Sequence, residues 1–244
     1  MKKTLLVIAI STVLTACGSG GSGGSGGSNS NNKVVDTKKD TQTTNPIVNN
    51  DTTKKDTTLK GVVLKDISKA DINKFELNGK TIMLMPNGFN VARFLTNSGG
   101  SFNGDTLTKS VSGTKYAETR FGILAPDNAD VIGFSQGKVT AVKDMPTKNA
   151  VVKYLGDFVV YENKEFETGT VDIDVNFGLK NIKIDAFADG SDKVIKTAKG
   201  TISGNQFTVD SGKGKGQFYG SKAAELSGVY KDGDIVASFG AKKQ

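Results

Sequence analysis

The chain has 244 residues and a net charge of +7, from 32 Lys and Arg against 25 Asp and Glu, with one Cys and neither His nor Trp. Because His is absent and the single Cys is at position 17, a folded domain after the first residues would have neither a His nor a thiol for catalysis. No block of five like charges and no basic stripe interleaved with aromatic residues occurs, so the sequence does not predict a nucleic-acid partner.

Residues 1–17 have the pattern of a bacterial export signal. Lys2 and Lys3 precede an apolar run over 5–14, which is too short to cross a bilayer and suits a secretory signal. The run ends in Leu-Thr-Ala-Cys, which resembles the lipobox of bacterial lipoproteins; the alternative is an ordinary signal with an incidental Cys. The resemblance implies that Cys17 is acylated and anchors the protein in membrane lipid. Gly18, where Asp would favour retention at the inner membrane, implies the outer membrane.

Residues 18–58 are predicted to be a disordered tether. They are rich in Gly, Ser, Thr, Lys, Asp and Asn and contain no aromatic residue, so they cannot bury enough apolar surface to offset the entropy of ordering. A glycine-rich chain of this length spans about 35 Å root-mean-square. The signal contributes +2 and the tether +1 to the net charge of +7, so residues 59–244 have a net charge of +4.

Residues 59–147 are predicted to form a smaller β-rich domain, a mixed sheet that packs on the next domain. The segments 79–86, 89–96 and 131–142 have strand character, and 68–79 is compatible with a short amphipathic turn or helix. A change of pattern near Pro146 marks the predicted boundary.

Residues 148–244 alternate apolar and polar residues. Val171, Ile173 and Val175 alternate with Asp and Asn, as in an antiparallel strand with one solvated face. Eight such segments are expected over 151–161, 166–177, 180–188, 194–203, 205–210, 215–220, 226–231 and 234–240, with turns at 204–205 and 232–233. The sequence therefore predicts an eight-stranded up-and-down barrel. Because charged side chains cover its outer face and aromatic girdles are missing, we expect a barrel with its apolar side inward.

The end of the chain resembles the closing segment of the C-terminal barrel of transferrin-binding protein B. The matching residues are Gly216, Phe218, Tyr219, Gly220, Ala223, Glu225, Leu226, Gly228, Phe239, Gly240, Ala241 and Lys242. Ser221 and Tyr230 depart from the pattern, where Pro and Phe are common. A second match, over Arg120-Phe121-Gly122, Gly137 and Met145-Pro146-Thr147, resembles the passage from the handle domain to the barrel in small surface lipoproteins of this superfamily.

We interpret residues 214–230 as a structural corner. Gly214, Gly216 and Gly220 are expected to let the chain turn and pack closely, Phe218 or Tyr219 to plug the barrel end, and Glu225 to cap backbone groups. The alternative, a phosphate-binding loop, lacks both the leading glycine and the Ser or Thr that should follow Gly-Lys.

The resemblance implies a single-lobe surface lipoprotein of the outer membrane, moved across that membrane by a surface lipoprotein assembly modulator. Members of the superfamily bind transferrin, lactoferrin, haemoglobin, haem or complement regulators such as factor H. Since we expect one handle and one barrel, the chain is most similar to the single-lobe members. We therefore expect a monomeric, non-enzymatic protein without cofactor or metal that binds a host serum protein, with a complement regulator favoured.

Three alternatives stay open. A haem or haemoglobin acquisition protein would have to ligate iron through Tyr or Met, because His is absent; the candidates are Tyr116, Tyr154, Tyr161, Met83 and Met85. Asp172 and Asp174, on one face of one strand, could hold a hard cation, although the other Asp residues singled out, Asp189 and Asp232, suit turns. A passive envelope protein would bind no host ligand. Residues 97–105 and 125–130 are candidate recognition loops, with plain turns as the alternative.

Overall fold

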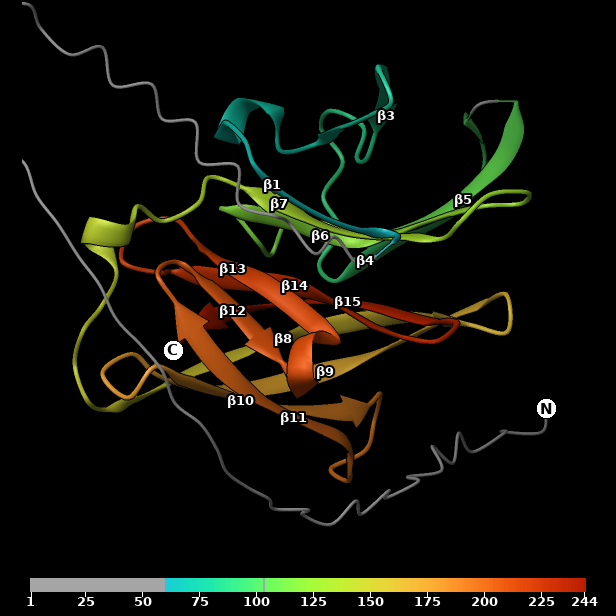
Figure 1. Cartoon of the computed structure of the whole chain (residues 1–244). Coiled ribbons are helices and arrows are strands. Elements are labelled where there is room, and N and C mark those ends of the chain that lie inside the picture. Colours follow the sequence, from blue (N-terminus) through green and yellow to red (C-terminus); the bar gives the residue numbers. More distant parts are fainter. Residues whose placement is uncertain (1–59, 103) are drawn as a thin grey trace, which may run out of the picture. The chain divides into compact units, whose positions relative to one another are not determined.

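The computed structural model describes residues 60–102 and 104–244 (Figure 1). The predicted lipidation site Cys17 and the predicted tether over 18–58 lie outside these residues. Short 3-10 turns are the helical elements of the described part: η1 (Lys69–Asp71), η2 (Val142–Asp144) and η3 (Asp210–Gly212). None of them has the length or apolar character needed to cross a bilayer.

The first part of the described chain is built from two sheets. Their strands are β1 (Val62–Asp66), β2 (Lys74–Leu77), β3 (Lys80–Met83), β4 (Phe94–Phe102), β5 (Asp105–Ser112), β6 (Thr119–Pro126) and β7 (Ile132–Gly137). The larger sheet has the order β1-β7-β6-β5-β4, and β1 runs parallel to β7 while the other pairs are antiparallel. This is the mixed sheet that the sequence indicated.

A hairpin of β2 and β3 covers one face of the larger sheet. Its turn, Asn78-Gly79, has positive φ at both residues, which suits a two-residue hairpin. Phe75 from β2 packs on Phe134 from β7, with ring centroids 4.8 Å apart. The segment 68–79, predicted as a turn or helix, is therefore divided between η1 and the strand β2, because Phe75 alternates with exposed neighbours and is buried under the sheet.

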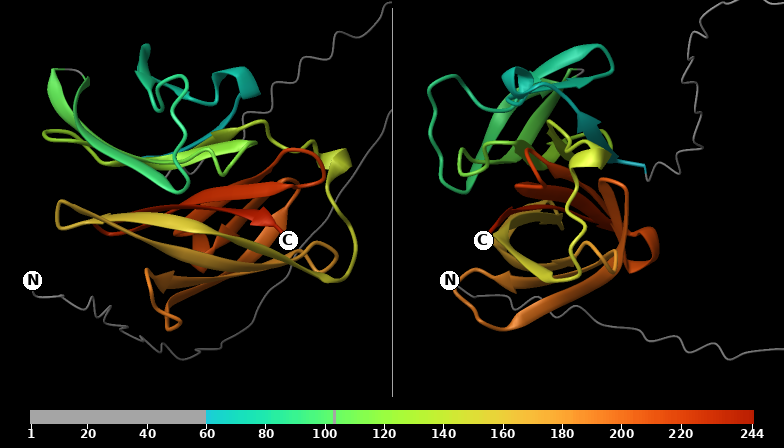
Figure 2. Two further views of the ribbon diagram at one scale, coloured as in Figure 1. Left: turned by 180° about the vertical axis from the view of Figure 1, so that it is seen from behind. Right: turned by 90° about the vertical axis from the view of Figure 1, so that its left-hand side faces the viewer.

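The second part is a closed eight-stranded antiparallel barrel, as predicted; Figure 2 shows it nearly end-on. Its strands are β8 (Val151–Glu162), β9 (Glu165–Asn176), β10 (Asn181–Ala188), β11 (Val194–Ser203), β12 (Gln206–Val209), β13 (Gly214–Tyr219), β14 (Glu225–Asp232) and β15 (Ile235–Lys243). The alternating residues Val171, Ile173 and Val175 lie in the buried core, so the apolar side faces inward. Closure pairs β15 with β8 and β9 with β10.

Two predicted turns can be compared directly with the strand register. Gly204-Asn205 joins β11 to β12, with φ of +60° at Gly204. The tip of the β14–β15 hairpin is Gly233-Asp234, because Asp232 is still paired with Ile235. The predicted tip at 232–233 is thus wrong by one residue. Gly233, which has positive φ, occupies the first of the two central positions of the turn instead of the second.

The larger sheet and the barrel belong to one compact unit and share a buried cluster. Val62 and Ile123 from the sheet pack there with Val159, Val229 and Val236 from β8, β14 and β15. The boundary expected near residues 147–148 falls in the segment between η2 and β8. The sheet is therefore apolar on both faces, covered on one by β2–β3 and on the other by the barrel.

Candidate binding surface and its supporting junction

The predicted motif over 216–220 lies on β13 and the turn after it. Phe218 points into the barrel core, where its ring centroid is 5.3 Å from that of Phe177 and 5.5 Å from that of Phe207. A Cβ on Gly216 would lie 2.2 Å from Cζ of Phe207, so glycine permits this packing. The expectation of a corner is wrong for Gly214 and Gly216, which are strand residues.

The turn itself is formed at Gly220, where φ is +73°. Gly228 and Gly240 act as Gly216 does, through close packing: an added Cβ would lie 2.9 Å from Phe239 Cζ in the first case and 2.2 Å from Phe121 Cε1 in the second. Gly240 therefore packs against the sheet, whereas Gly228 and Phe239 pack inside the barrel.

Tyr219 points out of the barrel and toward the sheet, so it does not plug the barrel end. Its hydroxyl lies 2.6 Å from Oγ of Ser135 on β7. Ser135 is in turn 2.5 Å from Oγ of Ser227, which is 2.6 Å from Oγ1 of Thr119. Burial raises the pKa of Tyr219, so the phenol stays neutral and can act as a donor. The result is a fully buried hydroxyl cluster between sheet and barrel.

Glu225 binds the backbone at the start of β6. Its carboxylate accepts hydrogen bonds from the N–H groups of Ala117 (2.9 Å), Glu118 (2.9 Å) and Thr119 (3.1 Å). Burial raises the pKa of Glu225, while the three N–H donors act in the opposite direction. The side chain thereby ties β14 of the barrel to the chain segment that enters the sheet.

Asp157 on β8 is the centre of a second junction between sheet and barrel. Its side chain is 3 % exposed and accepts from Arg93 Nε (3.0 Å), Lys115 Nζ (2.8 Å) and the Tyr116 hydroxyl (2.7 Å). Arg93 also pairs with Asp189 at 2.8 Å. One buried carboxylate therefore joins β8, the start of β4 and the loop before β6.

Sequence reasoning missed Asp157 and Arg93, and it noted Arg120 only as part of a motif. Arg120 is 4 % exposed and donates to the carbonyls of Gly113 (2.6 Å) and Tyr116 (3.1 Å). A signal was present, since Arg93 and Arg120 are the only two arginines in a chain otherwise rich in Lys. Arginine is preferred where several acceptors must be bound out of water.

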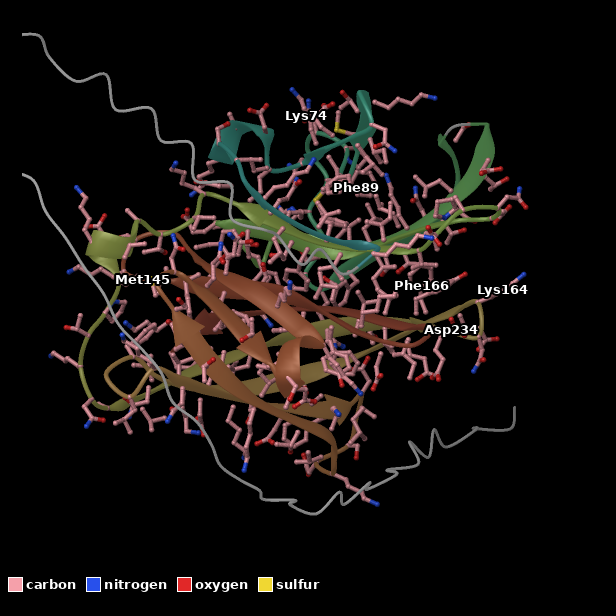
Figure 3. The ribbon with its side chains drawn as sticks, in the orientation of Figure 1. Lys74, Phe89, Met145, Lys164, Phe166 and Asp234 are labelled. Carbon is pink, nitrogen blue, oxygen red and sulfur yellow. The ribbon has the colours of Figure 1, made fainter. Side chains whose placement is uncertain are left out.

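Met145 and Pro146 lie between η2 and β8, and both are half-buried. Met145 packs against the barrel core, and its position beside the barrel can be followed in Figure 3. The contact is structural, because the chain passes here from the sheet to the first barrel strand.

The residues considered for haem or cation binding are largely engaged elsewhere. Tyr116, Tyr154 and Met85 are almost completely buried, and the Tyr154 hydroxyl donates to the carbonyl of Ala223 at 2.6 Å. Asp174 pairs with Lys153 at 2.8 Å. In the part of the chain that the structure describes, no three acidic, His or Cys side chains gather as metal ligands. Of the haem candidates, exposed Met83 on β3 and half-buried Tyr161 on β8 are left.

The sheet carries an outer layer formed by residues 67–92, which include η1, β2 and β3. Phe89 is 54 % exposed on this layer, although it is aromatic, and Met83 is 43 % exposed. A cleft of about 260 Å³ opens at the layer and is lined by Lys65, Ile67, Ser68, Asp71, Lys74, Glu76 and Gln136. Figure 3 marks Lys74 and Phe89. The layer offers apolar, cationic and anionic groups, which suits recognition of a protein surface.

The two predicted recognition loops have different structures. Over 125–130 a turn follows the end of β6, and it is held by an Asn128–Asp105 hydrogen bond of 2.8 Å and a Lys60–Asp130 ion pair of 2.9 Å. The segment 97–105 is a strand and hairpin instead of a loop, because residues up to Phe102 pair with β5. That prediction was wrong: glycine and Asn here form a bulge within the pairing, with φ of +103° at Gly99.

Comparison with known proteins identifies the barrel. Residues 145–243 match the family described as C-lobe and N-lobe beta barrels of Tf-binding protein B. No curated protein matches the chain. Among solved structures, intact Ap-TbpB with its N and C lobes is 26% identical over 71% of this chain and 42% of its own, with a TM-score of 0.54. Isotype 1 TbpB from serogroup B Neisseria meningitidis is 25% identical over 71% of this chain and 39% of its own, with a TM-score of 0.57.

The chain thus spans about two fifths of the length of these relatives. Their likeness covers 71% of this chain, which is more than the barrel alone and so includes part of the sheet. The resemblance that the sequence suggested is confirmed: residues 145–243 form a β-barrel of the transferrin-binding protein B type.

Proposed function

We propose that this protein is a surface lipoprotein that binds a host serum protein through the outer layer of its handle, residues 67–92. The observation that carries the proposal is an exposed apolar and charged layer on a sheet that is fixed to a barrel of the transferrin-binding protein B type. Binding requires no catalytic group, so the function is non-enzymatic.

The junction supports this function by holding the sheet rigid. Asp157, Glu225 and the hydroxyl cluster around Tyr219 each join the barrel to the sheet through buried hydrogen bonds. A surface that is ordered before binding loses little conformational entropy when its partner arrives. A preformed handle is therefore a suitable platform for a tight interface.

Phe89 is the proposed anchor of the interface. Exposed aromatic side chains that become buried on binding often carry much of the binding free energy. The loop of Phe89 is held in place, since Thr114 hydrogen-bonds to the Asn90 side chain and the Thr114 N–H donates to the Val91 carbonyl at 2.8 Å. The ring is thus presented on a fixed loop.

The favoured ligand is a complement regulator, and transferrin is the second candidate. The first is proposed because the handle and barrel of this chain resemble those of the small surface lipoproteins, which include complement-regulator binders. The second follows from the names of those relatives, which are transferrin-binding proteins. In both cases we propose an outer-membrane anchor at acylated Cys17 and passage through the lipoprotein export machinery.

The test compares Phe89→Ala with Leu179→Ala for binding to purified transferrin and purified complement regulators. Leu179 is a matched control, because it is 60 % exposed and lies on the barrel between β9 and β10. We expect Phe89→Ala to weaken binding by tenfold or more and Leu179→Ala to change it by less than twofold. Equal affinity of the two variants for the host protein would show that the outer layer is not the binding site.

A further inference from the structure

Strand β4 forms one edge of the larger sheet. β4 is the last strand in the sheet order and pairs only with β5. The strand order places β1 at the opposite edge of the sheet; Figure 1 labels β1, β4 and β5. Residues 96–101 of this strand are exposed to solvent. The edge includes most of the segment that the sequence suggested as a recognition loop.

The register tells which backbone groups of β4 point away from β5. The Gly113 N–H donates to the Arg93 carbonyl, which fixes Arg93 and Gly113 as a hydrogen-bonded pair. Because such pairs alternate along an antiparallel ladder, Leu95 bonds to β5 while Phe94 and Thr96 turn their N–H and C=O groups outward. None of the described residues outside the sheet supplies a backbone partner for these outward groups.

Over residues 94–97, before its bulge, the β4 edge has no charged residue and no Pro that would hinder pairing with another chain. Natural edge strands are commonly blocked by Lys, Pro or other charged residues. The stretch Phe94–Phe102 contains no charged residue and no Pro, whereas β1 at the opposite edge carries Lys65 and Asp66. A bulge interrupts the β4 ladder after Asn97, so the regular free edge is confined to 94–97.

We propose that β4 is a strand-addition site, at which an extended segment of the host protein pairs with residues 94–97. The inference rests on the proposed function and names the mode of recognition. The ligand chemistry follows from the edge itself, because only another extended backbone offers alternating donors and acceptors at the same spacing. The neutral edge sets no charge requirement on the incoming segment.

The size of the edge favours a larger partner over a second copy joined by β4 alone. Four residues extend over about 13 Å, and a strip of that length covers on the order of 150 Å². A stable interface needs about 800 Å² on each partner. The strand addition must therefore be one part of an interface that continues over other exposed surface, as proposed for the host protein.

The test uses Thr96→Pro and, as its matched control, Thr96→Ala. Both variants lose the Thr96–Ser110 hydroxyl contact of 2.7 Å, but only Pro removes the outward N–H. Pro is tolerated in edge strands at such positions, so the sheet is expected to remain folded. We expect Thr96→Pro to weaken binding to the host protein, transferrin or a complement regulator, by tenfold or more, and Thr96→Ala by less than twofold.

The outcomes separate this inference from the function on which it rests. Equal affinity of Thr96→Pro and wild type would overturn strand addition and leave the proposed function intact. Failure of the wild type to bind either class of purified protein would overturn both. Conversion of a wild-type dimer to a monomer by Thr96→Pro, with host binding unchanged, would assign the edge to a second copy and overturn the proposal.

If Thr96→Pro does not fold, a second measurement on the wild-type protein tests the proposal. Hydrogen exchange of the wild-type protein is followed with and without the bound host protein. Strand addition slows the exchange of the Phe94 and Thr96 amides by tenfold or more, because both become hydrogen-bonded. Unchanged exchange at these two amides would overturn the proposal.

Discussion

Replacing Asp157 by Asn tests whether buried charge at the junction holds the sheet on the barrel. Asn keeps the shape of the side chain but removes its charge, and its amide N–H₂ must face the donors of Arg93, Lys115 or Tyr116. Breaking a fully buried ion pair costs about 3–5 kcal/mol. Because the Arg93 and Lys115 side chains are each 38% exposed and can regain water, we expect a smaller loss, about 2–3 kcal/mol.

Urea denaturation gives this loss directly, and thermal unfolding should show a decrease in Tm of about 4–12 °C. Asp174→Asn is the control, since the same substitution there breaks only the exposed pair with Lys153 and should cost less than about 1 kcal/mol. If the two variants lose the same small free energy of unfolding, the Asp157 cluster does not hold the junction together.

Four further changes have expected outcomes. Gly216→Ala should lower the free energy of unfolding by about 1–3 kcal/mol in urea, because its Cβ would lie 2.2 Å from the ring of Phe207. Lys164→Gly should raise it by about 0.5–1 kcal/mol, since Lys164 has φ of +65° in the β8–β9 turn; no gain would show that the turn is unstrained. Burial raises the pKa of Glu225 above its ordinary 4.5, so protonation of Glu225 stabilises the folded state relative to the unfolded state. This contribution to the free energy of unfolding is lost as the pH rises through the pKa of the folded state. In denaturation experiments the stability advantage of wild type over Glu225→Gln should therefore shrink as the pH rises above 4.5, and an advantage that grows with pH would contradict the argument. Cys17→Ser should move the protein from the membrane to the soluble fraction of cells, and unchanged fractionation would exclude the lipid anchor.

The barrel could be predicted because its strands follow simple rules. Val171, Ile173 and Val175 alternate with polar residues, and short turns separate segments of similar length. Along every strand of a closed barrel, residues that face the interior alternate with residues that face outward. The local alternation of apolar and polar residues therefore assigns the face of each residue without long-range information. The closing motif added the superfamily, since its glycines are required by close packing against Phe207, Phe239 and Phe121.

Apart from the expectation that Glu225 binds backbone groups, the junction could not be predicted, because it depends on pairs of residues far apart in the chain. Asp157 meets Arg93 and Lys115, and Glu225 meets residues 117–119, more than a hundred positions earlier. Local patterns do not report such contacts. The Gly-rich segment at 97–105 misled for a related reason: its composition is typical of a loop, but pairing with β5 makes it an edge strand.

The most direct test of the central claim is a pull-down from host serum with the purified protein, alongside a haem titration followed at the Soret band. We predict the specific recovery of one serum protein, a complement regulator or transferrin, with no change in the Soret band and with recovery reduced for Phe89→Ala. A saturable Soret shift with nothing recovered from serum would contradict the account and leave Tyr161 and Met83 as the residues to mutate.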